Sequence, residues 1–191
     1  MRERPLGEDE GKDYVDAVPF PERVELTPIG RVVSPYVERH GTPRQAVVVE
    51  GTKSGDFAEA RIEIDPSQVP AEALGGLEGF DYVWVIALLH LNERWNPTVV
   101  PPRGPKVRRG VFATRAPHRP NQVGLSAVRL LRVEGHVLHV RGVDLLNGTP
   151  VLDIKPYVPY CDAFPDARSG WLDQLGEPLH GPDRPTRRRG K

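Results

Sequence analysis

The sequence DYVWVIALLH (residues 81–90) is the most apolar run in the chain. Its aromatic and β-branched side chains favour a strand over a helix, because such residues pack well on a pleated sheet. We therefore expect a central strand that ends at His90, with a loop that begins at Asn92.

Further strand-like patterns lie on both sides of this run. They occupy residues 24–33, 46–50, 60–64, 107–113, 125–133, 136–143 and 151–154. Helical patterns are confined to residues 66–77 and 169–175. The 21 Pro and 19 Gly place turns between these short segments. About eight short strands with a few short helices predict a mainly β fold, either a barrel or a sandwich.

The length of 191 residues suits one domain. We expect a disordered lead-in at residues 1–22, the β domain at 23–165, a short helix and turn at 166–181, and a basic disordered tail at 182–191. No apolar run approaches the roughly 20 residues of a membrane helix, and no signal peptide is recognisable. Cys161 is the single cysteine, so a cytoplasmic protein without an internal disulfide is expected.

Positive charge is concentrated in the middle of the chain, although the net charge is zero. Residues 94–133 contain no Asp or Glu, and they hold eight Arg and one Lys. A basic stretch of this kind suggests an anionic partner such as RNA. The alternative is a solvated surface that acidic residues balance elsewhere in space.

The loop GVFATRAPHRPNQVG (residues 110–124) lies inside this basic stretch. Pro117 and Pro120 restrict its backbone, so ordering it around a ligand costs little entropy. Stiff polar loops of this kind often carry function. Motifs for a Rossmann fold, a P-loop or a CxxC pair are missing from the sequence, and the six His are scattered, so we expect no metal site.

Five blocks of sequence together resemble a known family. They are IGRVVSPY (29–36), TPRQ (42–45), GLEGFDYVWVIALLH (76–90), GVFATRAPHRPNQVGLS (110–126) and DLLNGTPVLDIKPYVPYCD (144–162). In this order and spacing the chain resembles the TsaA/YaeB-like proteins, whose characterised members are TrmO-type tRNA methyltransferases. The family usually reads RPNPIG where this chain has Gln122 in place of Pro, which is expected to loosen the loop. The longer C-terminal extension of some bacterial members is also lacking, so a smaller RNA footprint is expected.

The resemblance implies a small, single-sheeted β-barrel that binds S-adenosylmethionine without a Rossmann fold. It implies a homodimer with cofactor sites near the subunit interface, and neither a membrane nor a metal as a partner. The implied reaction is methylation of N6 of threonylcarbamoyladenosine, the modified base immediately 3′ of the anticodon. The tRNA anticodon stem-loop is therefore the expected substrate.

Carried over by position, the resemblance also implies site residues. The cofactor-binding set is Ala46, Val47, Val48, His90, Leu91, Arg115, Leu125, Arg141, Gly142, Val143 and Asp144. Arg115 suits the cofactor carboxylate, and Asp144 suits its ammonium or a ribose hydroxyl. Asp153 is the candidate general base, with Tyr157 or Asn121 orienting the nucleobase. The residues assigned to RNA, by charge or by stacking, are Tyr36, Arg39, Arg44, Arg108, Arg109, Arg119 and Lys155.

Most of these assignments have a structural alternative. His90 can simply end a buried strand, Asp144 can shape a turn, and Asp153 can pair with Lys155 on one strand face. Tyr157 can be core packing, and Arg115 can be a surface cation. For the whole protein, the alternatives are a module that binds S-adenosylmethionine or RNA without methyl transfer, and a small-molecule methyltransferase built on the same barrel.

Overall fold

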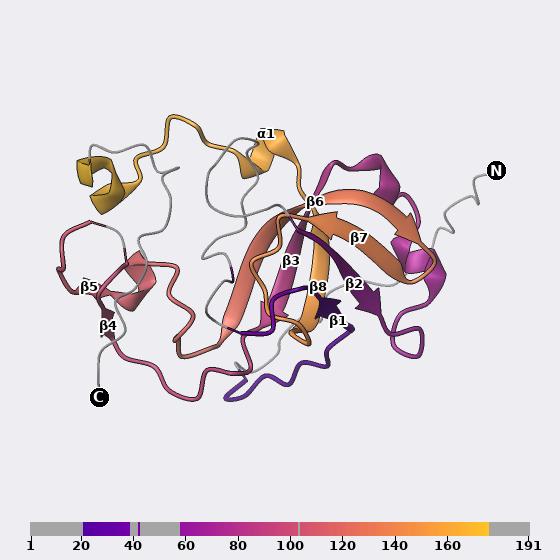
Figure 1. Cartoon of the computed structure of the whole chain (residues 1–191), viewed down its shortest axis with the longest axis horizontal. Coiled ribbons are helices and arrows are strands. Elements are labelled where there is room, and N and C mark those ends of the chain that lie inside the picture. The colour runs from indigo at the N-terminus through magenta and orange to yellow at the C-terminus, as the bar shows by residue number, and fades with distance from the viewer. Residues whose placement is uncertain (1–20, 39–41, 43–57, 103, 176–191) are drawn as a thin grey trace.

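The chain closes an antiparallel β-barrel, from which one long excursion extends (Figure 1). The computed structural model describes residues 21–38, 42, 58–102 and 104–175. The barrel strands are β1 (Gly30–Val33), β2 (Glu59–Ile64), β3 (Tyr82–Leu88), β6 (Val123–Glu134), β7 (Val137–Arg141) and β8 (Pro150–Pro156). They pair in the order β1-β2-β7-β6-β3-β8, and β8 pairs again with β1. The predicted single-sheeted, mainly β barrel is therefore confirmed.

Alternating polarity decides which side chains fill the barrel. Every second residue of β3 is buried, and the same pattern in β2 places Ala60, Ile62 and Ile64 inside. The other barrel strands complete this core with Val32, Val128, Leu130, Leu138, Val140 and Val151. Branched aliphatic side chains thus fill the interior, as is usual for a barrel of this size.

β1 and β2 approach closely at Gly30. A Cβ on Gly30 would clash with the backbone carbonyl of Glu63, which is why a glycine occupies this strand position. Gly30 lies opposite Ile64 in the register. On the outer face Arg31 Nη2 donates to Glu63 Oε2 at 2.9 Å, so a side-chain hydrogen bond also joins β1 to β2.

Between β3 and β6 the chain leaves the barrel. This excursion holds a two-stranded ribbon of β4 (Thr98–Val99) and β5 (Arg109–Gly110), followed by the 3₁₀ turn η3 (Val111–Ala113). The remaining elements are η1 (Ala71–Leu74), η2 (Leu77–Gly79), α1 (Pro159–Asp162) and η4 (Gly170–Leu175). Trp171 of η4 donates its Nε1–H to the Ala113 carbonyl at 2.8 Å, so the end of the described chain packs on the excursion.

Several predicted boundaries were wrong. Among the described residues the barrel has six strands rather than about eight; the predicted strand 107–113 contributes only β5, which pairs with β4 outside the barrel. Residues 107–113 are not one strand, since Thr114 N–H bonds back to the Val111 carbonyl and closes η3. The predicted helix at 66–77 is two 3₁₀ turns, separated where Gly76 adopts φ 82°. Of the predicted strand at 24–33 only β1 forms, and the one at 46–50 lies outside the described residues.

Candidate functional site

Seven of the predicted cofactor residues lie at or near strand ends on one edge of the barrel. Neighbouring antiparallel strands end and begin at the same edge, and here β1, β3 and β7 end where β2, β6 and β8 begin. His90 and Leu91 follow β3, Leu125 is near the start of β6, and residues 141–144 end β7 and follow it. We call this edge the loop rim, because the β3–β6 excursion also leaves from it (Figure 1).

Asp144 is held at the loop rim by a hydroxyl from β6. Ser126 Oγ donates to Asp144 Oδ1 at 2.6 Å, and Ser126 is only 5% exposed. A short hydrogen bond to a carboxylate is charge-assisted and stronger than one between neutral groups. Val143 and Leu145 on either side are buried, which fixes the backbone. Asp144 therefore presents a negative charge in a defined position.

The loop after Asp144 is anchored to the segment that follows β1. Ser34 Oγ donates to the Leu145 carbonyl at 2.9 Å, and Ser34 N–H donates to Asn147 Oδ1 at 3.2 Å. Asn147 N–H donates in turn to the Tyr36 carbonyl at 2.7 Å. The predicted Asn147-Gly148 turn thus links Tyr36, a predicted RNA contact, to the loop that carries Asp144.

Leu125 lies where β6 has an open edge. The Gln122 carbonyl accepts the Leu89 N–H at 2.7 Å. Because hydrogen bonding alternates along a strand, the N–H and C=O groups of even-numbered residues at the start of β6 point toward β3. By alternation, the backbone groups of Leu125 point to the β7 side. However, β7 ends at Arg141, which pairs with Arg129 and therefore stops short of Leu125. The N–H and C=O of Leu125 face a side that β7 does not reach, where they can bond a ligand.

His90 and Leu91 lie on the surface of the loop rim. Both are exposed, so His90 is not the buried strand-ending histidine of the structural alternative. Its N–H closes a tight turn onto the Leu88 carbonyl at 2.8 Å. The Gln122 amide donates to the Asn92 carbonyl, so the residue expected to loosen the loop adds a link between the end of β3 and the start of β6.

Arg141 combines an ion pair with a spare donor. Its Nη2 donates to Glu59 Oε1 at 2.6 Å, and this hydrogen bond and charge hold the pKa of Glu59 below its usual value. Its Nε–H is buried and has no hydrogen-bond partner among the described residues. A buried donor left without a partner is costly, so this N–H suits a ligand acceptor. Gly142, at φ 81°, then turns the chain toward Val143 and Asp144.

The excursion presents Arg115 on a loop that Arg119 ties together. Arg119 Nη1 donates to the Thr114 carbonyl at 2.9 Å, and its guanidinium lies 5.5 Å from the centre of the Phe112 ring. Arg115 is exposed and forms no hydrogen bond or ion pair within the described part of the chain, so nothing there joins it to Asp144. The RNA contact assigned to Arg119 stays a prediction.

Asp153 and Lys155 form the ion pair that the sequence offered as an alternative. Lys155 Nζ lies 2.8 Å from Asp153 Oδ2, while Asp153 Oδ1 accepts the Ile154 N–H at 2.8 Å. The register places Asp153 opposite Ile86, on the outer face of the barrel. Each carboxylate oxygen has one partner and a second lone pair, so proton uptake by Asp153 is sterically open but weakens its ion pair with Lys155.

Tyr157 lies at the other end of β3 from the loop rim. Its N–H donates to the Tyr82 carbonyl at 3.0 Å, and its ring packs 5.4 Å from the Trp84 ring. The length of β3, about 20 Å at roughly 3.3 Å per residue, separates it from His90. Packing therefore accounts for Tyr157 within one chain, and its role in orienting the base stays a prediction.

The remaining predicted residues divide into two groups. Asn121 is exposed just before β6, and Arg108 Nη1 donates to Thr98 Oγ1 at 3.3 Å. Residues outside the described part of the chain are Arg39, Arg44, Ala46, Val47 and Val48.

Sequence reasoning missed Ser126. The available signal was a polar residue at an inward position of an alternating strand, because a buried hydroxyl needs a partner. It also missed Trp84, whose Nε1–H donates to Asp162 Oδ2 at 3.0 Å. This contact joins α1 to the barrel wall.

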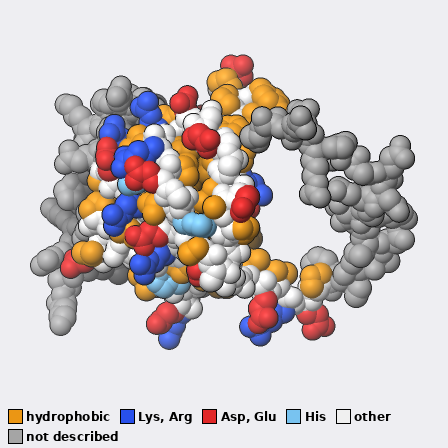
Figure 2. All heavy atoms as spheres, turned by 90° about the vertical axis from the view of Figure 1, so that its right-hand side faces the viewer, with side chains coloured by type: hydrophobic (Ala, Val, Ile, Leu, Met, Phe, Trp, Pro, Cys, Tyr) orange, Lys and Arg blue, Asp and Glu red, His pale blue; other side chains and the backbone are white. Residues whose placement is uncertain are grey.

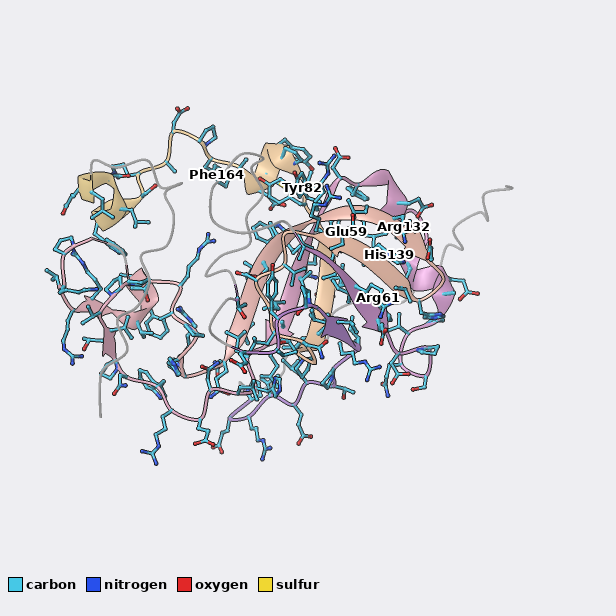
Figure 3. All side chains as sticks on the ribbon, viewed as in Figure 1. Glu59, Arg61, Tyr82, Arg132, His139 and Phe164 are labelled. Carbon is cyan, nitrogen blue, oxygen red and sulfur yellow. The ribbon has the colours of Figure 1, made fainter. Side chains whose placement is uncertain are left out.

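Charge is balanced on the side of the barrel that faces right in Figure 1. Acidic and basic side chains are interspersed there (Figure 2). Ion pairs on β1, β2, β6 and β7 join Arg31 to Glu63 at 2.9 Å, Arg61 to Glu63 at 3.7 Å, Arg132 to Glu134 at 2.6 Å and Arg141 to Glu59 at 2.6 Å. His139 Nε2 also lies 3.0 Å from Glu134 Oε2, and Figure 3 labels Glu59, Arg61, Arg132 and His139 on this side of the barrel. Glu134 thus neutralises Arg132, which the sequence had counted in the basic stretch.

Two further expectations concern metals and membranes. Among the described residues, no group of three or more His, Cys, Asp or Glu is arranged to hold a metal ion. In the same residues, no helix has the length and apolarity to span a membrane.

Comparisons with known proteins identify relatives of this chain. Residues 31–163 match the family described as the tRNA-methyltransferase O N-terminal domain. A tRNA (adenine(37)-N6)-methyltransferase of Escherichia coli is 39% identical over 150 residues, covering 75% of this chain and 61% of that protein. The mouse protein of the same name is 41% identical over 138 residues, covering 71% of this chain and 31% of that protein.

A solved structure agrees with the sequence matches. The crystal structure of TrmO from Pseudomonas aeruginosa superposes with a TM-score of 0.64 at 42% sequence identity. The match covers 79% of this chain and 63% of that one. The chain thus spans about three-fifths of the length of these bacterial relatives.

Proposed function

Because the chain belongs to the tRNA-methyltransferase O family, we propose that it transfers a methyl group from S-adenosylmethionine to N6 of the threonylcarbamoyladenosine immediately 3′ of a tRNA anticodon. The observation that carries the proposal is the loop rim. It holds a fixed carboxylate at Asp144, an open strand edge at Leu125 and, where β7 ends, the Arg141 Nε–H, a buried donor without a partner among the described residues. A tRNA substrate also makes the cytoplasm the expected location.

The loop rim offers groups that match the chemistry of the cofactor. Asp144 suits an ammonium or a ribose hydroxyl, and the exposed Arg115 suits a carboxylate through a bidentate pair. The N–H and C=O of Leu125 suit an adenine edge, and Arg141 Nε–H suits a further acceptor. When bound, S-adenosylmethionine supplies a methyl group already activated by its sulfonium, so the chain's own task is mainly positioning.

Asp153 is proposed to take the proton that N6 loses. The N6–H of a threonylcarbamoyl base belongs to a urea and becomes more acidic as N6 attacks the methyl group, so a carboxylate can accept the proton while the C–N bond forms. Such a general base contributes about 10²–10⁴-fold. Asp153 Oδ2 keeps one lone pair for this proton beside its contact with Lys155. Asp153→Asn should therefore lower turnover and leave cofactor affinity unchanged. Lys155→Gln is the matched control: if both variants reduce stability alike and neither reduces turnover, the pair is structural.

Exposed apolar side chains near the loop rim support a homodimer. Val123 is 40% exposed, Leu125 is 57% exposed and Leu91 is 64% exposed, which is costly on a free surface. A second copy packed there would cover them and bring two rims together. Light scattering during size-exclusion chromatography should give a dimer for the wild type and a monomer for Leu125→Glu. A monomeric wild type would refute this assembly.

The reaction is tested with purified full-length protein, S-adenosylmethionine and tRNA that carries the threonylcarbamoyl group. Mass spectrometry of the digested nucleosides should show threonylcarbamoyladenosine gaining one methyl group. A tRNA with guanosine at the same position is the matched control and should gain none. Cofactor binding without a methylated product on any tRNA would overturn the proposal in favour of a binding module.

A further inference from the structure

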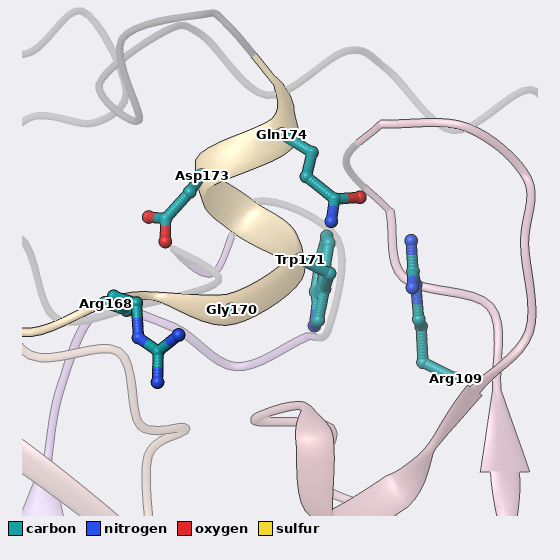
Figure 4. Close-up of a pocket in the computed structure, with 6 residues that line it drawn as sticks. All are labelled: Arg109, Arg168, Gly170, Trp171, Asp173 and Gln174. Atoms are coloured by element: carbon teal, nitrogen blue, oxygen red, sulfur yellow. The ribbon is translucent and has the colours of Figure 1, made fainter.

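A cavity of about 600 Å³ lies between η4 and β5 (Figure 4). Its lining residues are Arg109, Arg168, Gly170, Trp171, Asp173 and Gln174. Two of the six are arginines and one is acidic. The site assigned above to the cofactor uses none of them, so this cavity needs its own explanation.

The wall formed by Arg109 and Trp171 is built in advance of any ligand. Trp171 Nε1–H donates to the Ala113 carbonyl at 2.8 Å, which fixes the rotation of the indole. The Arg109 guanidinium lies 5.2 Å from the centre of that indole ring (Figure 4). A stacked guanidinium keeps the N–H groups at its edge free to bond in the plane. Arg109 is therefore held in place at little further entropic cost.

The other side of the cavity is lined by Arg168, which precedes η4, and by Asp173 within η4. Asp173 Oδ2 accepts the Ser169 N–H at 2.9 Å, which shapes the turn that follows Arg168. Arg168 itself is exposed, and Figure 4 shows it on the other side of Trp171 from Arg109. The Leu175 side chain packs closely on Gly104, so η4 is seated on the excursion at its far end as well.

We propose that this cavity binds the phosphate backbone of the tRNA, with Arg109 and Arg168 contacting phosphates on opposite sides of Trp171. The proposal rests on the proposed tRNA substrate and adds a subsite to it. Guanidinium groups pair with phosphate through paired N–H donors, and the surrounding stretch 94–133 has no acidic residue to neutralise Arg109. The Asp173 carboxylate accepts the Ser169 N–H and keeps its negative charge, so the two arginines give the lining a formal net charge of +1.

The test is binding of a fluorescently labelled anticodon stem-loop to the full-length protein, measured by anisotropy over a range of salt concentrations. Loss of one phosphate contact should reduce the slope of log K against log salt by about 0.7–0.9. At about 0.1 M salt this corresponds to roughly five- to eightfold weaker binding for Arg168→Ala or Arg109→Ala. Arg61→Ala, which removes the same charge from a β2 ion pair, is the matched control.

Three results overturn the proposal. Arg168→Ala and Arg61→Ala could weaken binding equally, which would indicate general electrostatics. The second result is a salt dependence that is unchanged in both Arg109→Ala and Arg168→Ala. The third is that inorganic phosphate at millimolar concentration binds the wild type and leaves its affinity for the stem-loop unchanged. The cofactor affinity of Arg168→Ala should stay at the wild-type value. Absence of methyl transfer in the wild type would instead refute the proposed function, so the two failures are distinguishable.

Discussion

Ser126→Ala tests whether the loop rim depends on the Ser126–Asp144 hydrogen bond. The bond is 2.6 Å long, its donor is 5% exposed, and its acceptor is a carboxylate. Hydrogen bonds to charged groups contribute about 1.5–3 kcal/mol. Because Asp144 is only half-buried, water can partly replace the lost hydroxyl, and we expect the lower end, about 1.5–2 kcal/mol.

Ser34→Ala is the matched control for this prediction. Ser34 lies at the same rim and donates its hydroxyl to the neutral Leu145 carbonyl at 2.9 Å, a bond that contributes about 1 kcal/mol. Urea unfolding followed by tryptophan fluorescence measures both variants, and calorimetry measures their cofactor affinity. We expect a larger loss of stability and a weaker cofactor affinity for Ser126→Ala. A loss no larger than that of Ser34→Ala, with cofactor affinity unchanged, would refute the reasoning.

Three further predictions concern the barrel. Gly30→Ala should destabilise the fold by more than about 1 kcal/mol in urea titrations, because the new Cβ meets the Glu63 carbonyl; an unchanged midpoint would show that β1 can shift. Leu138→Ala removes a fully buried side chain and should cost about 2–5 kcal/mol, and a smaller loss would mean that the core collapses around the cavity. Bonds from the Val158 N–H and Trp84 hold the pKa of Asp162 below its usual value, so its contribution to stability is present above pH ~4 and is lost as the pH falls through the folded-state pKa. Asp162→Asn should therefore flatten the acid limb of the stability profile, and an unaltered profile would exclude this role.

Local patterns predicted the barrel well where burial enforces them. The central strand at 81–90 became β3, because alternation and β-branching act on the same residues that the core buries. The ribbon and η3 were not predictable in the same way, since residues 107–113 look strand-like but have only β4 to pair with. Which strand a segment pairs with depends on residues far away in the sequence, so a short stretch of sequence does not reveal it.

The sequence indicated which segments carry the candidate site, but it did not indicate which side chains contact one another there. Family resemblance assigned His90, Leu125 and Asp144 to one site, and in the structure each of them lies close to a strand end. It could not separate Tyr157 from that rim, because the sequence does not state at which end of β3 a residue of β8 lies. The Ser126–Asp144 bond likewise depends on register across 18 residues.

The affinity of the full-length protein for S-adenosylmethionine, measured by isothermal titration calorimetry in three variants, tests the loop rim most directly. We predict that the wild type binds, that Asp144→Asn binds about tenfold or more weakly, and that Tyr157→Phe binds like the wild type, since a tenfold change corresponds to about 1.4 kcal/mol, within the range of one charge-assisted hydrogen bond. No binding by the wild type, or a loss in Tyr157→Phe with none in Asp144→Asn, would contradict the assignment of the cofactor to this rim.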